Sequence, residues 1–457
     1  MRTLLSNLSG RRISALVGDL LDSLSWGSSR KGVKGDGEVR ATHLLRTVEA
    51  LLSRRGEASG VMLARLVLAA YQEADPAEKT VFLRRLVDDF GADEIGLEQA
   101  ATAWLTDRSY EAAKRLRAAS EPRRREILRR LNLAPGGTLA LVRMREDLMA
   151  RLREAPDLHP LDEDFAHLFV TWFNRGFLTL RHIDWDTPAA ILEKIIRYEA
   201  VHVIQGWDDL RNRLVPTDRR CFAFFHPSLV DEPLIFVEVA LTTAIPAAIA
   251  PLLAPGRAPI EAEQATCAVF YSISNTQKGL AGVSFGNFLI KQVVEDLRHA
   301  LPNLATFVTL SPVPGFAKWL ARERAGETLP EADRAALVAL DASEWHRDPA
   351  LVEQVRVPLL AAAARYFLTP RLADGRIPDP VGRFHLGNGA RLERLDFLGD
   401  LSPHGLAQSH GLMVNYLYDL DAIERNHEEF VENGNVVASP EVRRHLEAKS
   451  RPVPVGA

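Results

Sequence analysis

The stretch from Thr266 to Phe316 constrains the fold more than any other part of this 457-residue chain. Its first apolar run, Cys267–Tyr271, is rich in β-branched and aromatic residues and predicts a buried strand. A polar loop that contains glycine follows. A second apolar run, Leu304–Leu310, predicts another strand, and this strand ends abruptly at Ser311 and a proline-rich turn.

The segment between the two runs predicts an amphipathic helix. Apolar residues recur there at every fourth position, namely Phe285, Leu289, Val293, Leu297 and Leu301, and Pro302 ends the pattern. The result is a strand–loop–helix–strand unit. Its loop would aim free backbone N–H groups and the positive end of the helix dipole at one place, which suits a phosphate or pyrophosphate. Ser311 is expected at the same edge of the sheet, where ligands of α/β folds bind.

The N-terminal part of the chain reads as helical almost throughout. Residues 1–40 combine a short amphipathic stretch with Gly, Ser and charge, and we expect them to be flexible. Apolar residues then recur at three- and four-residue spacing in eight segments: Ala41–Arg54, Gly60–Glu73, Pro76–Gly91, Leu97–Leu105, Ser109–Ala118, Glu121–Leu133, Thr138–Glu154 and Asp162–Asn174. We predict a helical bundle over residues 41–185 that serves assembly, and a second domain over 186–457.

The C-terminal part has a mixed α/β pattern. It opens with a stretch that predicts one long helix from His182 to Leu214, begun by Asp186-Thr187-Pro188. Strands are predicted at Cys221–Phe225, Leu234–Leu241, Thr266–Tyr271 and Leu304–Leu310. Helices are predicted at Phe316–Ala325, Pro330–Leu340, Val352–Phe367 and Ser439–Lys449, with a loop leading into the segment that contains His385.

Composition excludes several classes of protein. A net charge of −4 gives no electrostatic basis for binding nucleic acid. The longest apolar run, Leu241–Leu253, is broken by Pro246 and Pro251 and is too short to span a bilayer. Cys221 and Cys267 are the only cysteines and lie in apolar runs, so we expect reduced core residues, no metal site and a cytoplasmic protein.

Five blocks in the last 270 or so residues, in this order, resemble the malonyl-CoA decarboxylase family: HPSLVDEPLIFVEVALT, SISNTQKGLAGVSFGNFLIKQVVEDL, FVTLSPVPGFAKWL, FHLGNGARLERLDFLGDLS and GLMVNYLYDL. The preceding RYEAVHVIQGWDDLRNRL resembles the domain junction of the same family. Five blocks in register make a far more specific signal than a single glycine motif.

The resemblance implies the removal of CO2 from malonyl-CoA to give acetyl-CoA, without metal, biotin or another cofactor. It also implies an N-terminal helical domain that forms homo-oligomers, tetramers in the family, and an acetyltransferase-like catalytic domain. The serine and histidine of the family fall on Ser311 and His385, and its acyl-CoA loop on Ser274 to Leu280. The residues expected to bind the substrate and its CoA are Ser274, Asn275, Thr276, Gln277, Lys278, Gly279, Leu280, Gly282, Asn388 and Tyr416.

The chemistry of decarboxylation fits these residue types. Loss of CO2 from a malonyl thioester leaves an enolate that needs hydrogen-bond donors at oxygen and a proton at carbon. Our hypothesis is that Ser311 holds the malonyl carboxylate or carbonyl, and that His385, which ordinarily titrates near neutrality, supplies or relays the proton. Asn388, in the turn after His385, is a candidate hydrogen-bond partner that would orient the histidine. Lys278 is the nearby cation suited to a phosphate.

Several alternatives stay open at this stage. An acyl-CoA transferase or thioesterase would use Ser311 as nucleophile, although its context lacks the Gly-x-Ser-x-Gly elbow. A non-catalytic CoA-binding or scaffold protein would suit the large helical part. Tyr416 is predicted either to reach the site or to pack in the core. Glu238 is either a cleft carboxylate or a paired one. His226, His404 and His410 read as turn, loop or pocket-wall residues, not metal ligands.

Overall fold

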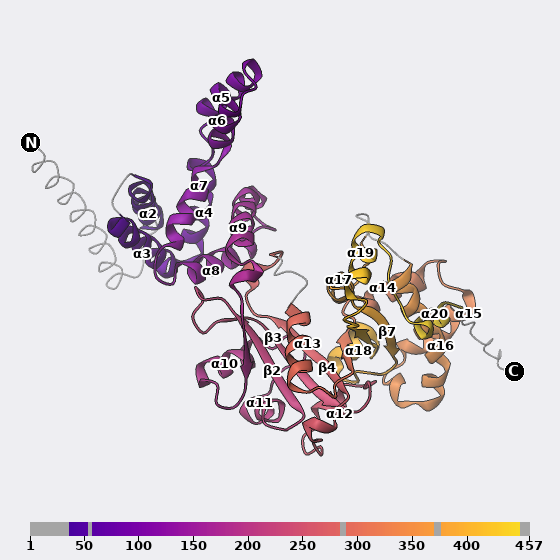
Figure 1. Ribbon diagram of the computed structural model, residues 1–457. Coiled ribbons are helices and arrows are strands. Elements are labelled where there is room, and N and C mark those ends of the chain that lie inside the picture. Colours follow the sequence, from indigo (N-terminus) through magenta and orange to yellow (C-terminus); the bar gives the residue numbers. More distant parts are fainter. Residues whose placement is uncertain (1–35, 54–56, 284–288, 370–375, 448–457) are drawn as a thin grey trace, which may run out of the picture. The chain divides into compact units, whose positions relative to one another are not determined.

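The computed structural model describes residues 36–53, 57–283, 289–369 and 376–447. The chain forms two compact units. The first contains the chain through Phe177 together with two later segments, His226–Val230 and Gln277–Ser284, and the second contains the remainder. The prediction of an all-helical N-terminal region followed by a mixed α/β region is confirmed (Figure 1). None of the helices in these described ranges is both long and apolar enough to cross a membrane.

The first unit is built from helices, and each of the eight predicted helical segments is present. They are α2 (Asp36–Leu52), α3 (Glu57–Glu73), α4 (Pro76–Asp89), α5 (Glu94–Thr106), α6 (Tyr110–Ser120), α7 (Arg123–Asn132), α8 (Gly137–Met149) and α9 (His159–Trp172). Of the predicted flexible segment 1–40, residues 1–35 lie outside the described residues, and α2 begins at Asp36. Helices α5 and α6 form a hairpin that projects from the rest of this unit (Figure 1).

Local signals explain where these helices start. Asp75 caps α4: its side chain accepts the N–H groups of Ala77 and Glu78, and the Glu78 carboxylate accepts the N–H of Asp75 in return. Between α7 and α8 the chain turns at Gly136, whose φ of 73° suits glycine. The helices bury a core of aliphatic and aromatic side chains, including Leu83, Ile127, Leu141, Met144, Phe165 and Phe169.

The second unit contains an eight-stranded sheet with the order β1-β2-β3-β4-β5-β8-β6, and β7 pairs with β8. The strands are β1 (Thr179–Ile183), β2 (Arg219–Phe225), β3 (Pro233–Thr242), β4 (Cys267–Asn275), β5 (Thr306–Thr309), β6 (Ser311–Pro312), β7 (Arg391–Asp396) and β8 (Met413–Leu417). Neighbours from β1 to β4 are antiparallel, and β4 and β5 are parallel. The four predicted strands correspond to β2, β3, β4 and β5.

The second unit also contains helices. They are α10 (Ala189–Tyr198), α11 (Trp207–Leu214), α12 (Ala250–Leu253), α13 (Leu289–Ala300), α14 (Phe316–Ala325), α15 (Glu331–Leu337), α16 (Pro349–Leu368), α17 (Pro380–Gly387), α18 (Pro403–Ser409), α19 (Ile423–Asn433) and α20 (Pro440–Glu447). In α13 the predicted apolar stripe is confirmed for Leu289, Val293 and Leu297, which are buried. Phe285 lies outside the described residues.

The prediction of one long helix from His182 to Leu214 is wrong. His182 lies in β1, and the remaining residues form two helices, α10 and α11. The break follows from Glu199, whose carboxylate accepts the N–H groups of Val201 and His202 and so replaces helical hydrogen bonds. The segment that contains His385, into which the predicted loop leads, holds the short helix α17, which the side chain of Asp379 caps.

Gly389 is expected to be a stability-determining position in the second unit. Its φ is 82°, and a Cβ there would overlap the carbonyl oxygen of Ile423. We expect Gly389→Ala to lower the free energy of unfolding by roughly 3 kcal/mol, because backbone strain and a clash with main chain add together. Gly434→Ala is the matched control, since its φ of 66° is also positive but the space around it is open. That control should lose only about 1 kcal/mol in urea unfolding, and equal losses would contradict the steric argument.

Candidate active site

The sheet of the second unit opens after Phe270. The parallel strands β4 and β5 have Phe270 and Thr309 as their last paired residues. Strand β4 continues along β3 to Asn275, whereas the chain after β5 turns so that Ser311 pairs with β8. The carboxyl ends of the two strands therefore part, and Ser311 stands where they do. Ligand sites of α/β sheets lie at such strand ends.

Ser311 and His385 are hydrogen-bonded. Ser311 Oγ lies 3.2 Å from His385 Nε2, and the two residues are 74 positions apart in the chain. Ser311 Oγ also donates to Thr309 Oγ1 at 2.8 Å. Both members of the pair are buried, with 5% and 3% of their surface exposed. The structure thus brings together the two residues to which the family resemblance assigned catalysis.

Tyr418 is the second partner of the imidazole, at 2.8 Å between its hydroxyl and His385 Nδ1. Burial raises the pKa of Tyr418 well above its ordinary value, and a hydrogen bond from the side chain of Asn388 opposes that shift. Because Ser311 Oγ donates its proton to Thr309, it accepts from His385 Nε2, which places the ring proton on Nε2 and leaves the Tyr418 O–H to donate to Nδ1. The side chain of Asn388 is a partner of Tyr418 and not of the His385 ring, whereas the backbone N–H of Asn388 donates to the carbonyl of His385 at 3.1 Å.

The imidazole of His385 is neutral at physiological pH. Burial lowers its pKa to about 3, because the charged form would lose its hydration. The expectation that His385 titrates near neutrality is wrong for this environment. A neutral imidazole still carries one proton and one acceptor, so it can pass a proton between its two partners.

Tyr416 packs against the same histidine. The two rings are stacked with centroids 4.7 Å apart and planes at 25°, and Tyr416 is fully buried. Its backbone N–H donates to Thr309 Oγ1 at 3.2 Å, while its buried hydroxyl has no hydrogen-bond partner within the described part of the chain. Tyr416 is thus a core residue, and its ring contacts that of His385.

Two side chains of the predicted CoA loop are engaged inside the protein. Ser274 Oγ accepts the N–H of Ala200 and donates to Glu199, both at 3.3 Å. Thr276 Oγ1 donates to the carbonyl of Leu234 at 3.1 Å. Both serve to hold the end of β4, and we expect their hydroxyls to contribute little to a ligand.

The remaining loop residues differ in exposure. Asn275, Lys278 and Gly282 are exposed, Gln277 is half-buried, and Gly279 and Leu280 are buried. A short 3-10 helix, η4, spans Lys278–Leu280, and Gly282 has a φ of 78°. Residues 274–276 belong to the second unit and 277–284 to the first. The predicted helix N-terminus at residues 284–288 lies outside the described residues.

Other residues noted in the sequence have local roles. Glu238 is fully buried and pairs with Arg213 at 3.1 Å, and burial raises its pKa to about 8 despite this partner. His226 Nε2 donates to the carbonyl of Trp172 at 3.0 Å. The described residues contain no His, Cys, Asp or Glu group able to hold a metal, His404 and His410 included. Cys221 and Cys267 are buried and free, as the sequence indicated.

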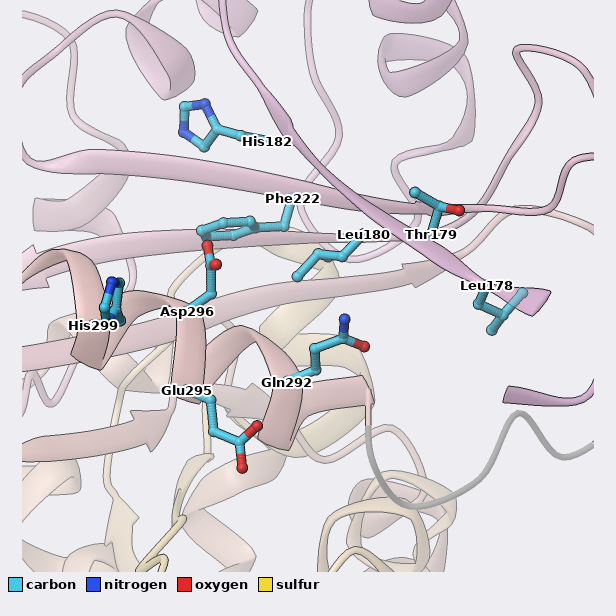
Figure 2. Close-up of a pocket in the computed structure, with 9 residues that line it drawn as sticks. All are labelled: Leu178, Thr179, Leu180, His182, Phe222, Gln292, Glu295, Asp296 and His299. Atoms are coloured by element: carbon cyan, nitrogen blue, oxygen red, sulfur yellow. The ribbon is translucent and has the colours of Figure 1, made fainter. Parts of the chain in front are cut away.

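A cavity of about 760 Å³ lies elsewhere in the second unit. Its lining consists of Leu178, Thr179, Leu180, His182, Phe222, Gln292, Glu295, Asp296 and His299 (Figure 2). Helix α13 contributes the acidic side chains of this lining, and the apolar ones are Leu178, Leu180 of β1 and Phe222 of β2. None of the predicted site residues lines it, so its volume gives no support for a role in catalysis.

Sequence reasoning missed Thr309 and Tyr418. Each lies two positions from a predicted site residue in a strand segment, Thr309 before Ser311 and Tyr418 after Tyr416. Side chains two apart in a strand share a face. This period-two rule was the available signal for both.

The chain thus combines a helical region with a mixed α/β domain that holds a buried, hydrogen-bonded serine–histidine pair, and each region matches a family model. Residues 176–455 match the malonyl-CoA decarboxylase C-terminal domain, and residues 90–173 match the malonyl-CoA decarboxylase N-terminal domain. The mitochondrial malonyl-CoA decarboxylase of Anser anser anser is 35% identical over 392 residues, covering 78% of this chain and 77% of that protein. The Rattus norvegicus protein is 34% identical over 404 residues, covering 81% and 82%. The chain belongs to the malonyl-CoA decarboxylase family.

Solved structures agree with this membership. The crystal structure of malonyl-CoA decarboxylase from Rhodopseudomonas palustris superposes with a TM-score of 0.86 at 60% identity, covering 88% of this chain and 99% of that one. The structure from Agrobacterium vitis gives 0.85 at 58% identity, with 89% and 100% covered.

The burial of His385 predicts a specific pH dependence of stability. An unfolded histidine takes up a proton below pH about 6.5, whereas folded His385 does so only near its pKa of about 3. Its contribution is therefore complete above pH about 6.5 and falls by about 1.4 kcal/mol per pH unit as the pH drops toward 3. We expect His385→Gln to flatten the slope of unfolding free energy between pH 5 and 6.5 by about that amount, measured with urea. Substituting the exposed His159 in the same way is the control, and an unchanged slope in His385→Gln would refute the assignment.

Proposed function

We propose that this protein is a carboxy-lyase that converts malonyl-CoA to acetyl-CoA and CO2. The observation that carries the proposal is the buried network in which Tyr418, His385 and Ser311 are hydrogen-bonded in series at an opening of the sheet. Family membership supports the substrate, since the relatives are named for malonyl-CoA. The network would supply what the reaction requires, namely a hydrogen-bond donor to the enolate oxygen and a proton that can be transferred to the α-carbon.

The proposed reaction has two steps. The bond between the α-carbon and the malonyl carboxylate breaks, CO2 leaves, and the electron pair forms the thioester enolate. The Ser311 O–H, turned from Thr309 to the substrate, donates to the developing negative charge on oxygen. A proton then reaches the α-carbon through Ser311 and His385 Nε2, while Nδ1 accepts one from Tyr418. Solvent resupplies one proton per turnover, so the balance closes without a redox partner.

Transfer or hydrolysis of the acyl group is less well supported by the same residues. A nucleophilic serine needs a base that ends the step as an imidazolium, and that cation is usually stabilised by a carboxylate on Nδ1. The Nδ1 partner of His385 is the phenol of Tyr418, and burial strongly disfavours the charged ring. A neutral relay suits proton delivery to an enolate better than acyl-enzyme formation.

The loop from Ser274 to Leu280, with Gly282, is proposed to bind the CoA part of the substrate. Lys278 is exposed and would meet a phosphate, and Asn275 and Gly282 are the other exposed members. Asn388 and Tyr416 are proposed to act on the acyl end through Tyr418 and His385. The proposed reaction uses no metal and no biotin. We also propose a cytoplasmic location, which the two free, buried cysteines favour.

Purified protein with malonyl-CoA, a chelator and no biotin should release acetyl-CoA and CO2 in equal amounts. We expect Ser311→Ala and His385→Asn to lower kcat by about 10² to 10³ while CoA binding persists, because each removes a donor used in the reaction. Ser439→Ala is a matched control, since this buried serine donates to the carbonyl of Glu393 outside the site. Release of free malonate and CoA would instead identify a thioesterase, and CoA binding without any product would identify a binding protein.

The proposal also includes a homo-oligomer, a tetramer by family resemblance, assembled through the helical region. The hairpin of α5 and α6 carries exposed apolar side chains: Ile95 is 71% exposed, Leu105 69% and Tyr110 77%. Helix α5 has no buried residue at all. Such a face on a folded helix is expected to pack against a second copy.

We expect the double variant Ile95→Lys, Leu105→Lys to have a smaller mass in solution than the wild type, because two lysines cannot be buried without partners. Light scattering after size-exclusion chromatography measures this. Val338→Lys is the control, an equally simple change at an exposed valine of the second unit. An unchanged mass in the double variant would mean that the hairpin is not an interface.

A further inference from the structure

Helix α8 of the helical unit holds the loop to which CoA binding is assigned. Arg145 lies in α8 and is almost completely buried, with 4% of its side chain exposed. Its Nη1 donates to the carbonyl oxygens of Gly279 and Ala281, each at 3.0 Å. Its Nε donates to Asp162 Oδ1 at 2.8 Å, which fixes the orientation of the guanidinium. All of these residues belong to the first unit.

Gly279 lies directly on the backbone of the same helix. A Cβ at this position would overlap the carbonyl oxygen of Val142, and its carbonyl carbon would be only 2.9 Å away. Val142 and Arg145 are three residues apart and so share one face of α8. The glycine is therefore needed for contact with the helix.

The contact with Arg145 also decides where the N–H groups of the loop point. In a trans peptide the N–H points opposite to the carbonyl of the same peptide unit. Tying the carbonyl of Ala281 to Arg145 therefore turns the N–H of Gly282 away from α8, and Gly282 is exposed. An outward N–H beside the exposed Lys278 is the arrangement that binds an anionic phosphate.

We propose that Arg145 is a positioning residue for the nucleotide part of the CoA substrate, an inference that rests on the proposed function of the loop. Arg145 touches no substrate. It fixes the loop backbone from residue 279 to 282, so that removing it weakens binding of the pyrophosphate without altering the chemistry at Ser311.

The test compares malonyl-CoA with malonyl-pantetheine, which lacks the pyrophosphate and the nucleotide. For Arg145→Gln we expect KM for malonyl-CoA to rise about tenfold, with kcat within threefold of wild type and KM for malonyl-pantetheine unchanged. Arg145→Lys, which keeps the charge and can still reach one carbonyl, should recover part of the loss. A general structural defect would instead raise both KM values or lower kcat for both substrates.

Two further variants keep the test decisive if Arg145→Gln folds poorly. Gly279→Ala should reproduce the selective rise in KM, because its Cβ pushes the loop off Val142 while Arg145 is intact. Arg124→Gln is the matched control: it removes another buried arginine of the same unit, paired with Asp164 at 2.5 Å, but leaves the loop untouched. It should change stability and not the ratio of the two KM values.

The outcomes distinguish failure of the proposed function from failure of the inference about Arg145. Absence of acetyl-CoA from the wild type would refute the proposed function itself. An active wild type whose KM ratio is unchanged by Arg145→Gln and Gly279→Ala would leave the function standing and overturn the inference. A ratio shifted to the same extent by Arg124→Gln would also overturn it.

Discussion

The buried hydrogen bond between Ser311 and His385 is the interaction on which the proposed chemistry depends. Burial lowers the pKa of His385 to about 3, so the charged imidazolium form is not populated near neutral pH. The neutral ring can then act only by releasing a proton from one nitrogen while the other nitrogen accepts one. Each nitrogen therefore needs a defined hydrogen-bond partner. Ser311 and Tyr418 are those partners. The low dielectric that neutralises the ring also strengthens each hydrogen bond in the series, so its geometry must be accurate.

The central strands could be predicted from the sequence, and the strands next to the site could not. Strands β2 to β4 are long and almost wholly buried, so they appear as continuous apolar runs. Strand β6 has two residues, one of them Pro312. Strand β7 (RLERLD) has only two apolar residues, Leu392 and Leu395, and a register shift between Leu392 and Arg394 interrupts the period-two pattern. Propensity gives no strong signal for such segments, and long-range pairing with β8 decides their conformation.

The candidate site was predicted in part for similar reasons. Ser311 and His385 came from blocks resembling a family, because a serine before proline and a histidine between apolar residues carry no catalytic signal in isolation. The hydrogen-bond partner of His385 Nδ1 was not predicted correctly, since Tyr418 and not Asn388 contacts the ring. The contact between Arg145 and Gly279 could not be predicted either, because the two residues are 134 positions apart in the sequence. Such contacts arise only when the chain is folded.

If the loop binds CoA, as proposed, the contact between Arg145 and the loop links substrate binding to the folding of the helical unit. If CoA binds the loop only in the shape that α8 imposes, local opening of α8 must lower affinity. By linkage, bound CoA must in turn stabilise α8 by the same free energy. Arg145 is buried and pairs with the half-buried Asp162, so an arrangement that separates them leaves the arginine charge unpaired and is costly. On the proposed function, substrate affinity would therefore depend on a folded α8 independently of oligomer formation.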